Sequence, residues 1–362
     1  MTIFSGVRRV SVGIVLAAFV TTAAMANEQP WLVYEGGDGP GAGKRIVLIS
    51  GDEEYRSEEA LPLLARMLSE HHGFHCTVLF PWNERRGYID PNHQGNIPGL
   101  EKLDDADLMI TFNRFRNPTD AQMEAIDRYL KAGKPVLGIR TSTHAFQFPG
   151  DSPWAHYSNA YSGDVEGWEG GFGRVVLGEQ WISHHGDHKG DSTHGIIPPE
   201  AADHPVTRGI EDMAIWGSTD VYGVRLPLPG DSFPVVLGQV TLRAGDFDND
   251  DIHFGMRETD SEPRGEDKND PMMPIAWTRT YQVPDGEQGR AFASTIGASV
   301  DLLSEGTRRL LIHGAYWAVG LEDAIPEEGA NADIVGTFEP TQYNFHDAGY
   351  WRDRNLQPAD LE

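Results

Sequence analysis

The sequence contains a single cysteine, Cys76, so it cannot form an internal disulfide bond. This cysteine lies in residues 74–80, a segment that alternates in the manner of a β-strand. A lone cysteine in such a segment is expected to be a small residue of the hydrophobic core. The cysteine content therefore excludes a disulfide-stabilised scaffold.

Basic residues are scarce: 29 Lys and Arg stand against 55 Asp and Glu, which gives a formal net charge of −26. A surface this acidic repels phosphate groups, so we expect neither nucleic acid nor an anionic membrane surface as a partner. The charge suits a soluble protein that acts on neutral or cationic ligands. It leaves the oligomeric state open.

Long apolar runs are absent apart from one near the amino terminus. Residues 10–20 are apolar, follow Arg8 and Arg9, and lead into small residues that end at Ala26. This order is typical of a secretory signal peptide, here residues 1–26, that is cleaved after Ala26. The run is too short for a membrane-spanning helix, and no cysteine stands directly after Ala26 to carry a lipid anchor. We therefore expect a secreted or periplasmic protein without membrane insertion.

A Gly-x-Gly-x-x-Gly motif does not follow the first expected strand, so we expect no bound nucleotide. The Gly-rich segment 36–44 resembles a phosphate-binding loop only superficially. Asp38 stands where the first Gly of such a loop is needed, and the strand follows the segment instead of preceding it. Residues 27–43 are interpreted as a Gly-rich lead-in to the folded domain.

Short apolar runs and helical patterns alternate through the first half of the chain. Buried strands are expected at residues 44–50, 74–80, 107–112 and 135–139, and helices at 57–72 and 119–130. This alternation predicts an α/β fold: a doubly wound, flavodoxin-like, mostly parallel sheet with helices on both faces.

The second half is less regular. Between residues 148 and 270 the apolar runs are short, which predicts a long loop-rich insertion within a single domain over residues 44–324. Short strands are expected there at residues 175–177, 221–224 and 235–237, and an apolar helix follows at 305–321. The Pro- and aromatic-rich tail, residues 325–362, is expected to wrap the surface or to be partly disordered.

Polar residues follow three of the expected strands at their carboxyl ends, where open α/β sheets bind ligands. We expect these residues to converge on one substrate-binding site: Asp52, Glu53 and Tyr55, then Asn113, Arg114 and Arg116, then Arg140, Thr141, Ser142 and His144. The arginines could hold the oxygens of a hydroxyl-rich ligand, or they could form salt bridges between loops. Tyr222 could stack on a sugar ring, or it could pack in the core.

Residues 184–194 contain four His and two Asp within eleven positions. Imidazole and carboxylate groups bind Zn²⁺ and similar metals, which makes His184, His185 and His188 candidate ligands of a divalent metal. The same three histidines could instead serve as general acids or bases near neutral pH. The frequent Gly residues indicate a loop, so a solvated polar segment is the third interpretation.

The chain resembles the ThuA-like (trehalose utilisation) family over residues 45–322. The matching pieces are Ser-Gly-Asp at 50–52, Phe-Asn-Arg-Phe-Arg at 112–116, residues 133–139 with Thr-Ser-Thr-His at 141–144, Asp-His-Pro-Val-Thr-Arg-Gly at 203–209, Asp-Val-Tyr at 220–222, Pro-Ile-Ala-Trp-Thr at 274–278, Gly-Arg-Ala-Phe at 289–292 with Gly297, and the helix at 308–318. The resemblance implies a class I glutamine amidotransferase-like fold. It also implies a role in the catabolism of trehalose and related disaccharides, including keto sugars. Relatives often have His where this chain has Arg140, so no histidine-based role applies there.

Glutaminase chemistry is not expected, despite the implied fold. That chemistry needs a cysteine nucleophile on the turn after a central strand, and this chain has Arg140 to Thr143 there. Ser142 is a weak replacement, because the Gly-x-Ser-x-Gly surround of a serine nucleophile is absent.

We expect acid–base chemistry on a small carbohydrate, by an enzyme of the hydrolase or lyase/isomerase type. His184, His185, His188 and His144 are the expected proton carriers, and the arginines are expected to bind oxygens. A non-catalytic sugar-binding protein and a metal-dependent hydrolase or lyase are the alternatives.

Overall fold

The computed structural model describes residues 1–2 and 29–362. The expected signal peptide, apart from its first two residues, lies outside this part of the chain. Within the described residues, no helix combines the length and the apolar character that crossing a membrane requires.

One mixed sheet of ten strands organises the described chain, in the order β1-β3-β2-β6-β7-β12-β11-β10-β8-β9. The strands are β1 (Trp31–Tyr34), β2 (Arg45–Gly51), β3 (His75–Leu79), β6 (Leu108–Asn113), β7 (Val136–Ile139), β8 (Asp191–Ile196), β9 (Ile215–Gly217), β10 (Phe233–Leu242), β11 (Met273–Gln282) and β12 (Gln288–Ser294). The five from β3 to β12 are mutually parallel, and the flanking pairs are antiparallel. A separate hairpin joins β4 (Trp82–Asn83) to β5 (Tyr88–Ile89).

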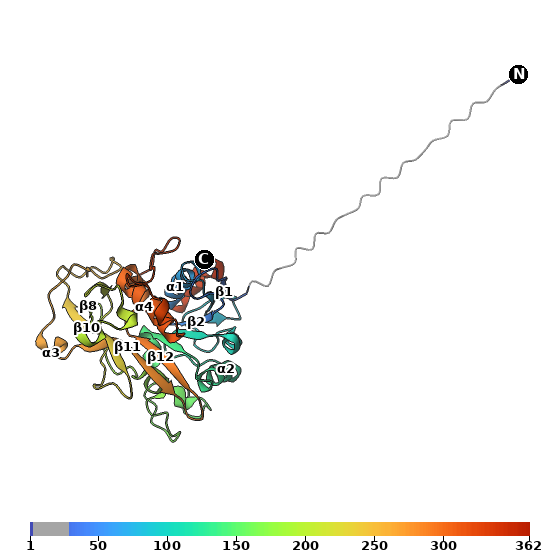
Figure 1. Cartoon of the computed structure of the whole chain (residues 1–362). Helices are drawn as coiled ribbons and strands as arrows, with labels where there is room; N and C mark the ends of the chain where they lie inside the picture. The colour runs from blue at the N-terminus through green and yellow to red at the C-terminus, as the bar shows by residue number, and fades with distance from the viewer. Residues whose placement is uncertain (3–28) are drawn as a thin grey trace.

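Helices cover both faces of the sheet. They are α1 (Ser57–Glu70), α2 (Asp120–Lys131), α3 (Glu266–Asn269), α4 (Glu305–Ala318) and α5 (Ala348–Arg354). Alternate residues of β2 enter two hydrophobic clusters: Ile46 and Leu48 pack with α1 and α4, whereas Val47 and Ile49 pack with α2. Figure 1 shows α1 and α4 together, apart from α2. The predicted α/β class and the four predicted central strands are confirmed.

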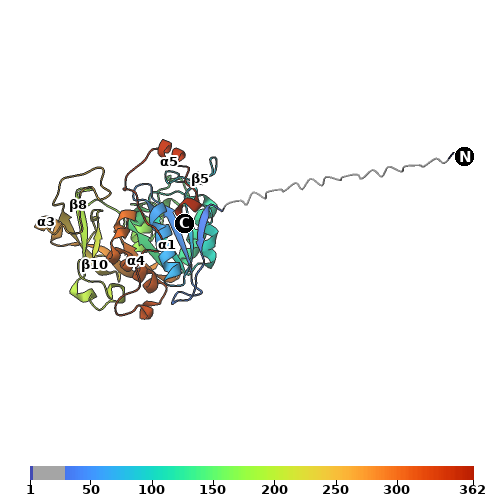
Figure 2. The same ribbon diagram turned by 90° about the horizontal axis from the view of Figure 1, so that it is seen from above.

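The loop-rich half of the chain forms the antiparallel end of the sheet. Figures 1 and 2 both show β8, β10 and α3 at the end of the molecule opposite β1 or α1. The predicted strand at 235–237 is part of β10. Sequence patterns do not indicate that β8 and β10 extend the same sheet, because β10 pairs with β8 and β11, which lie about 30 to 40 positions away in the chain.

Two short apolar runs were interpreted wrongly as strands. Residues 175–177 belong to a turn of π-helix over Gly173–Leu177, in which Leu177 packs against Gly138 of β7. A Cβ at Gly138 would lie 2.5 Å from the Leu177 side chain, so only glycine leaves room there. Residues 221–224 form no strand: Tyr222 makes an isolated bridge with His184 instead. Burial alone does not distinguish strand from helix in runs of three or four residues.

The C-terminal tail, residues 325–362, wraps the body and adds to its core. Tyr343 and Trp351 are fully buried, and Leu356 is nearly so, in the same cluster as α1 and α4. Partial disorder of this tail was therefore the wrong alternative. The tail also reaches the carboxyl edge of the parallel strands, as described below.

His313 of α4 fastens the start of this tail. Its Nδ1 lies 2.9 Å from the carbonyl oxygen of Val206, and its Nε2 accepts the backbone N–H of Ala330 at 2.9 Å. Because Nε2 accepts a hydrogen bond, the ring is neutral and Nδ1 donates. Burial lowers the pKa of His313 to about 4, outweighing its hydrogen bond to Val206.

This lowered pKa predicts a loss of stability in acid. In the unfolded chain His313 binds its proton with the ordinary pKa of about 6.5. The contribution of neutral His313 to the free energy of unfolding is therefore complete above pH 6.5, and it falls between pH 6.5 and pH 4 because only the unfolded chain binds the proton there. Between pH 7.5 and pH 5 we expect the wild type to lose about 2 kcal/mol relative to His313→Gln. Denaturant unfolding of both proteins at the two pH values measures this difference, and equal losses would contradict the assignment.

Candidate functional site

The loops after β2, β6 and β7 converge at the carboxyl edge of the parallel strands, as the sequence predicts. Thr141 donates a hydrogen bond to Asp52, which joins the loops after β7 and β2. Arg114 after β6 pairs with Glu53 after β2 at 2.5 Å. Asp52 also accepts the backbone N–H groups of residues 54 and 55, which fixes the turn after β2.

Arg140 lies beneath these loops, fully enclosed. Its Nη1 donates to the carbonyl oxygens of Asp220 and Thr295, both at 2.7 Å, and its Nη2 donates to Asp220 Oδ1 at 3.1 Å and to the Tyr55 hydroxyl at 3.2 Å. The rings of Tyr55 and Tyr222 lie 4.6 and 3.9 Å from its guanidinium carbon. Arg140 therefore positions other groups from below and does not meet solvent.

Three more expected binding residues are also enclosed. The guanidinium of Arg116 donates hydrogen bonds to Glu53 and to the carbonyl oxygens of residues 91, 93 and 114. The Ser142 hydroxyl donates a hydrogen bond to the Thr111 carbonyl oxygen at 2.6 Å. This contact is a second argument against Ser142 as a nucleophile. The amide of Asn113 is buried and makes no hydrogen bond to any described residue. These side chains shape the site from within the protein.

The exposed part of the site is built on Asp220. His184 Nδ1 lies 2.7 Å from Asp220 Oδ2, and His188 Nδ1 lies 3.3 Å from Oδ1. His188 Nε2 in turn lies 3.3 Å from Glu54 Oε1. Glu54, His188, Asp220 and His184 thus form a continuous series of polar contacts, which we call the His–Asp group.

The electrostatics of this group fix its protonation. Burial alone would raise the pKa of Asp220, but the hydrogen bonds to His184 and His188 and the nearby Arg140 hold it well below its ordinary value. Asp220 is therefore a carboxylate, which only accepts, so Nδ1 of His184 must carry the proton. Burial, and next the Asp52 carboxylate, raise the pKa of Glu54 to about 7.

The structure brings together only some of the expected histidines. His185 turns away: its Nε2 lies 2.8 Å from the Lys268 carbonyl oxygen, so the structure does not bring it together with His184 and His188. His144 lies under the site among Phe115, Trp181 and Tyr222, with ring centroids 4.9 to 6.2 Å away. Burial, together with Arg114 and Arg140, lowers the pKa of His144 well below its ordinary value, so this ring stays neutral.

Seven side chains, His184 among them, form a closed series of neighbouring contacts at this edge of the sheet. Glu54 lies beside Arg114, at 3.6 Å, and Phe115, His144, Trp181, His184 and His188 follow with neighbouring groups 4.9 to 5.8 Å apart. The series closes from His188 back to Glu54. Polar side chains and aromatic rings are therefore neighbours at this edge of the sheet.

Metal binding has one structural candidate among the described residues. One ligand atom each from His184, His188 and Asp220 lie within 4.8 Å of one another, and the side chain of His184 is partly open to solvent. The donor types suit Zn²⁺ or a similar ion. Asp220 already contacts Arg140 and Nδ1 of both histidines. It therefore fits better as a carboxylate that orients two metal-binding histidines than as a metal ligand itself.

Sequence reasoning missed three contributors to this site. Glu54 follows β2 as Glu53 and Tyr55 do, and this shared position was the available signal. Asp220 stood in a matching family piece, Asp-Val-Tyr at 220–222, which was the available signal. The third is the tail segment 343–345, whose Tyr343 stacks on Tyr55 with centroids 5.3 Å apart.

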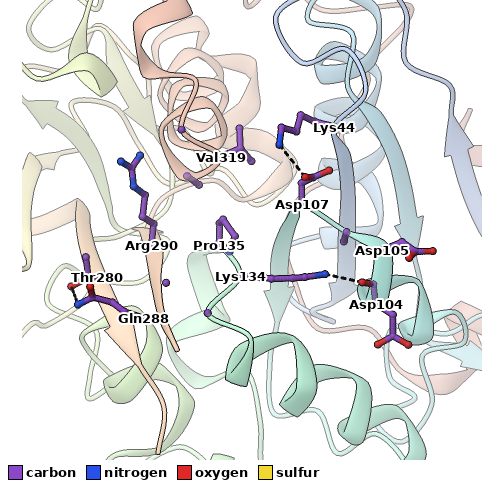
Figure 3. A pocket seen from close by; sticks show the side chains of 15 residues that line it. Lys44, Asp104, Asp105, Asp107, Lys134, Pro135, Thr280, Gln288, Arg290 and Val319 are labelled. Atoms are coloured by element: carbon purple, nitrogen blue, oxygen red, sulfur yellow. Dashed lines mark hydrogen bonds and ion pairs between the residues drawn. The ribbon is translucent and has the colours of Figure 1, made fainter. Parts of the chain in front are cut away.

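A cavity of about 620 Å³ lies at the opposite edge of the sheet, where the parallel strands begin (Figure 3). Its basic residues have partners: Lys44 pairs with Asp107 at 3.1 Å, and Lys134 donates to the Asp104 carbonyl oxygen at 2.7 Å. Arg290 pairs with Glu322 at 2.9 Å. This cavity is remote from the His–Asp group and offers no comparable chemistry.

No protein-family model and no curated protein matches the sequence. Two similar solved structures carry the provisional description "thua-like protein". The protein from Bacteroides uniformis ATCC 8492 is 15% identical, with a TM-score of 0.42 over 78% of this chain and 93% of that one. The protein from Parabacteroides merdae ATCC 43184 is also 15% identical, with a TM-score of 0.41 over 76% and 90%. Both descriptions name the family that the sequence resembles.

Proposed function

We propose that this chain is a secreted or periplasmic carbohydrate-active enzyme that performs acid–base chemistry at a sugar carbon or a glycosidic bond. The observation that carries the proposal is the His184–Asp220 pair. A buried carboxylate holds Nδ1 of a partly exposed imidazole, which leaves Nε2 as the ring nitrogen that can exchange a proton with a ligand. Imidazole in this arrangement takes a proton from a ligand and returns it later.

Asp220 serves this proton transfer in two ways. It fixes the tautomer and orientation of His184, and its charge stabilises the imidazolium that forms when Nε2 accepts a proton. Nothing in the transfer requires Asp220 itself to be protonated, in line with its low pKa.

Glu54 supplies a second titratable group on the same site. Its carboxyl is enclosed beside His188 and Arg114, and its pKa of about 7 leaves both protonation states populated near neutral pH. A carboxylic acid and an imidazole with different environments can take the acid and base roles in one reaction. The ring nitrogens of His188 lie near Glu54 on one side and near Asp220, the partner of His184, on the other.

The substrate class follows from the surroundings and from the family resemblance. Arginine and carboxylate side chains at the site pair with one another, as Arg114 does with Glu53, which leaves no large excess of either charge for an ionic ligand. Aromatic faces of Phe115 and Trp181 flank the polar edge. Disaccharides and their keto forms fit both features, and they are the compounds that the resemblance implies.

A metal-dependent hydrolase or lyase is the second candidate, favoured by the close approach of ligand atoms from His184, His188 and Asp220. In that case His184 and His188 would hold a divalent metal that supplies Lewis acidity. A non-catalytic sugar-binding protein remains the third alternative.

The test is turnover of a panel of trehalose, sucrose and maltose and their keto derivatives, with and without chelator. We expect the purified protein to convert at least one compound, and chelator treatment to leave the rate unchanged. Elemental analysis accompanies the assay. Stoichiometric zinc with loss of turnover in chelator would move the assignment to the second candidate, and binding without turnover would move it to the third.

A further inference from the structure

Phe345 is a large apolar side chain that stays 51% exposed beside the His–Asp group. One face of its ring is covered by the Arg114 guanidinium, whose central carbon lies 4.8 Å from the ring centroid. Arg114 also lies 4.9 Å from the ring of Phe115, so it is held between two aromatic rings. Its pairs with Glu53 and Glu54 hold the guanidinium further.

The backbone that carries Phe345 is fastened on both sides. The N–H of Asn344 donates to the Glu54 carbonyl oxygen at 2.9 Å, and the Asn344 carbonyl accepts a hydrogen bond from Arg56. Lys189 donates to the Asn344 side-chain oxygen at 3.2 Å. On the other side, the His346 carbonyl accepts the Asn92 amide at 2.9 Å.

An exposed phenylalanine on such a fixed segment gains little stability from its uncovered face, because that face remains in water. Its position is nevertheless set by contacts with the loop after β2, with Lys189 next to His188, and with Arg114. The segment therefore presents a preorganised apolar surface at the edge of the candidate site. Preorganised surfaces bind with a smaller loss of conformational entropy.

We propose that Phe345, backed by Arg114, is the stacking face of a subsite for the pyranose ring of a neutral sugar. The apolar C–H face of such a ring would cover the exposed face of Phe345, while the polar edge at Glu54 and Arg114 meets its hydroxyl groups. The inference rests on the proposed function for its substrate class. It adds that the C-terminal tail selects ligands that contain a ring.

The chain provides a matched control in Phe247, which is 52% exposed and also lies over an arginine, Arg243, at 5.3 Å. Trehalose serves as the ring-containing probe, and sorbitol serves as an open-chain polyol without a ring face. Calorimetric titration of the full chain measures the Kd of each probe for the wild type, Phe345→Ala, Phe345→Trp and Phe247→Ala.

We expect Phe345→Ala to weaken trehalose binding about tenfold, Phe345→Trp to keep it, and Phe247→Ala to leave it unchanged. Sorbitol should bind all four proteins equally weakly. Unchanged trehalose affinity in Phe345→Ala would overturn the proposal, as would a wild type that does not bind trehalose. So would an equal loss of affinity in Phe247→Ala.

The same titration separates this inference from the proposed function, because binding does not need turnover. If trehalose binds, responds to Phe345→Ala and is never converted, the subsite stands and the catalytic assignment fails. If a panel sugar is converted at the same KM by Phe345→Ala and the wild type, the catalytic assignment stands and the subsite fails.

Discussion

Arg140→Met is expected to lower the free energy of unfolding by about 3–5 kcal/mol, since it removes one partner of a buried ion pair. The Arg140 and Asp220 side chains are 1% and 0% exposed. Methionine fills a similar volume but cannot donate to the Asp220 and Thr295 carbonyl oxygens or to the Asp220 carboxylate. Those acceptors would stay buried without their charged donor.

The matched control is Arg128→Met on α2. Arg128 pairs with Asp104 at 3.0 Å, but both side chains are more than half exposed, so the expected loss is within about 1 kcal/mol. Urea unfolding of the two variants beside the wild type measures both values. Equal losses in Arg140→Met and Arg128→Met would show that Arg140 does not organise the site.

His184→Gln is expected to reduce kcat by roughly 10²- to 10⁴-fold on the panel sugar that the wild type converts, while stability changes little. Glutamine can still donate a hydrogen bond to Asp220, yet it cannot accept and release a proton near neutral pH. The side chain of His184 is 38% exposed, so its replacement leaves no large cavity. Steady-state kinetics together with thermal melting separate the two effects.

His185→Gln is the control, because it is the next residue of the same loop but points to Lys268 instead of Asp220. Its kcat should stay within about twofold of the wild type. Similar losses in both variants would mean that the loop needs its histidines for folding, and that proton transfer is not specific to His184.

The location of the site could be predicted from the sequence because it depends on local patterns. Apolar runs at 44–50, 107–112 and 135–139 form β2, β6 and β7, and polar residues directly follow each. In parallel strands, those positions meet at one edge of the sheet. The convergence of Asp52, Arg114 and Arg140 follows from that geometry alone.

The direction of individual side chains could not be predicted, because it depends on contacts between distant segments. His184 and His185 are neighbours in the sequence, but one faces Asp220 and the other faces Lys268. Arg140 was expected to meet a ligand, but the carbonyl oxygens of Asp220, 80 positions later, and Thr295, 155 positions later, occupy its Nη1. Only the folded chain shows which partner each group takes.

The tail escaped prediction for a related reason. Residues 325–362 have no helical or strand periodicity, so the sequence offered no register from which to place them. The burial of Tyr343 and the stacking of this ring on Tyr55 come from docking onto a surface that α1 and its preceding loop create. The absence of periodicity is therefore weak evidence of disorder in a tail that contains aromatic residues.

The most direct test of the proton-carrying role of His184 is the turnover of one panel sugar by chelator-treated wild type and by chelator-treated His184→Gln. The account predicts full activity in the wild type and a loss of at least 100-fold in the variant, with trehalose binding retained in both. Equal turnover by the two proteins, or wild-type activity that disappears with the metal, would contradict it.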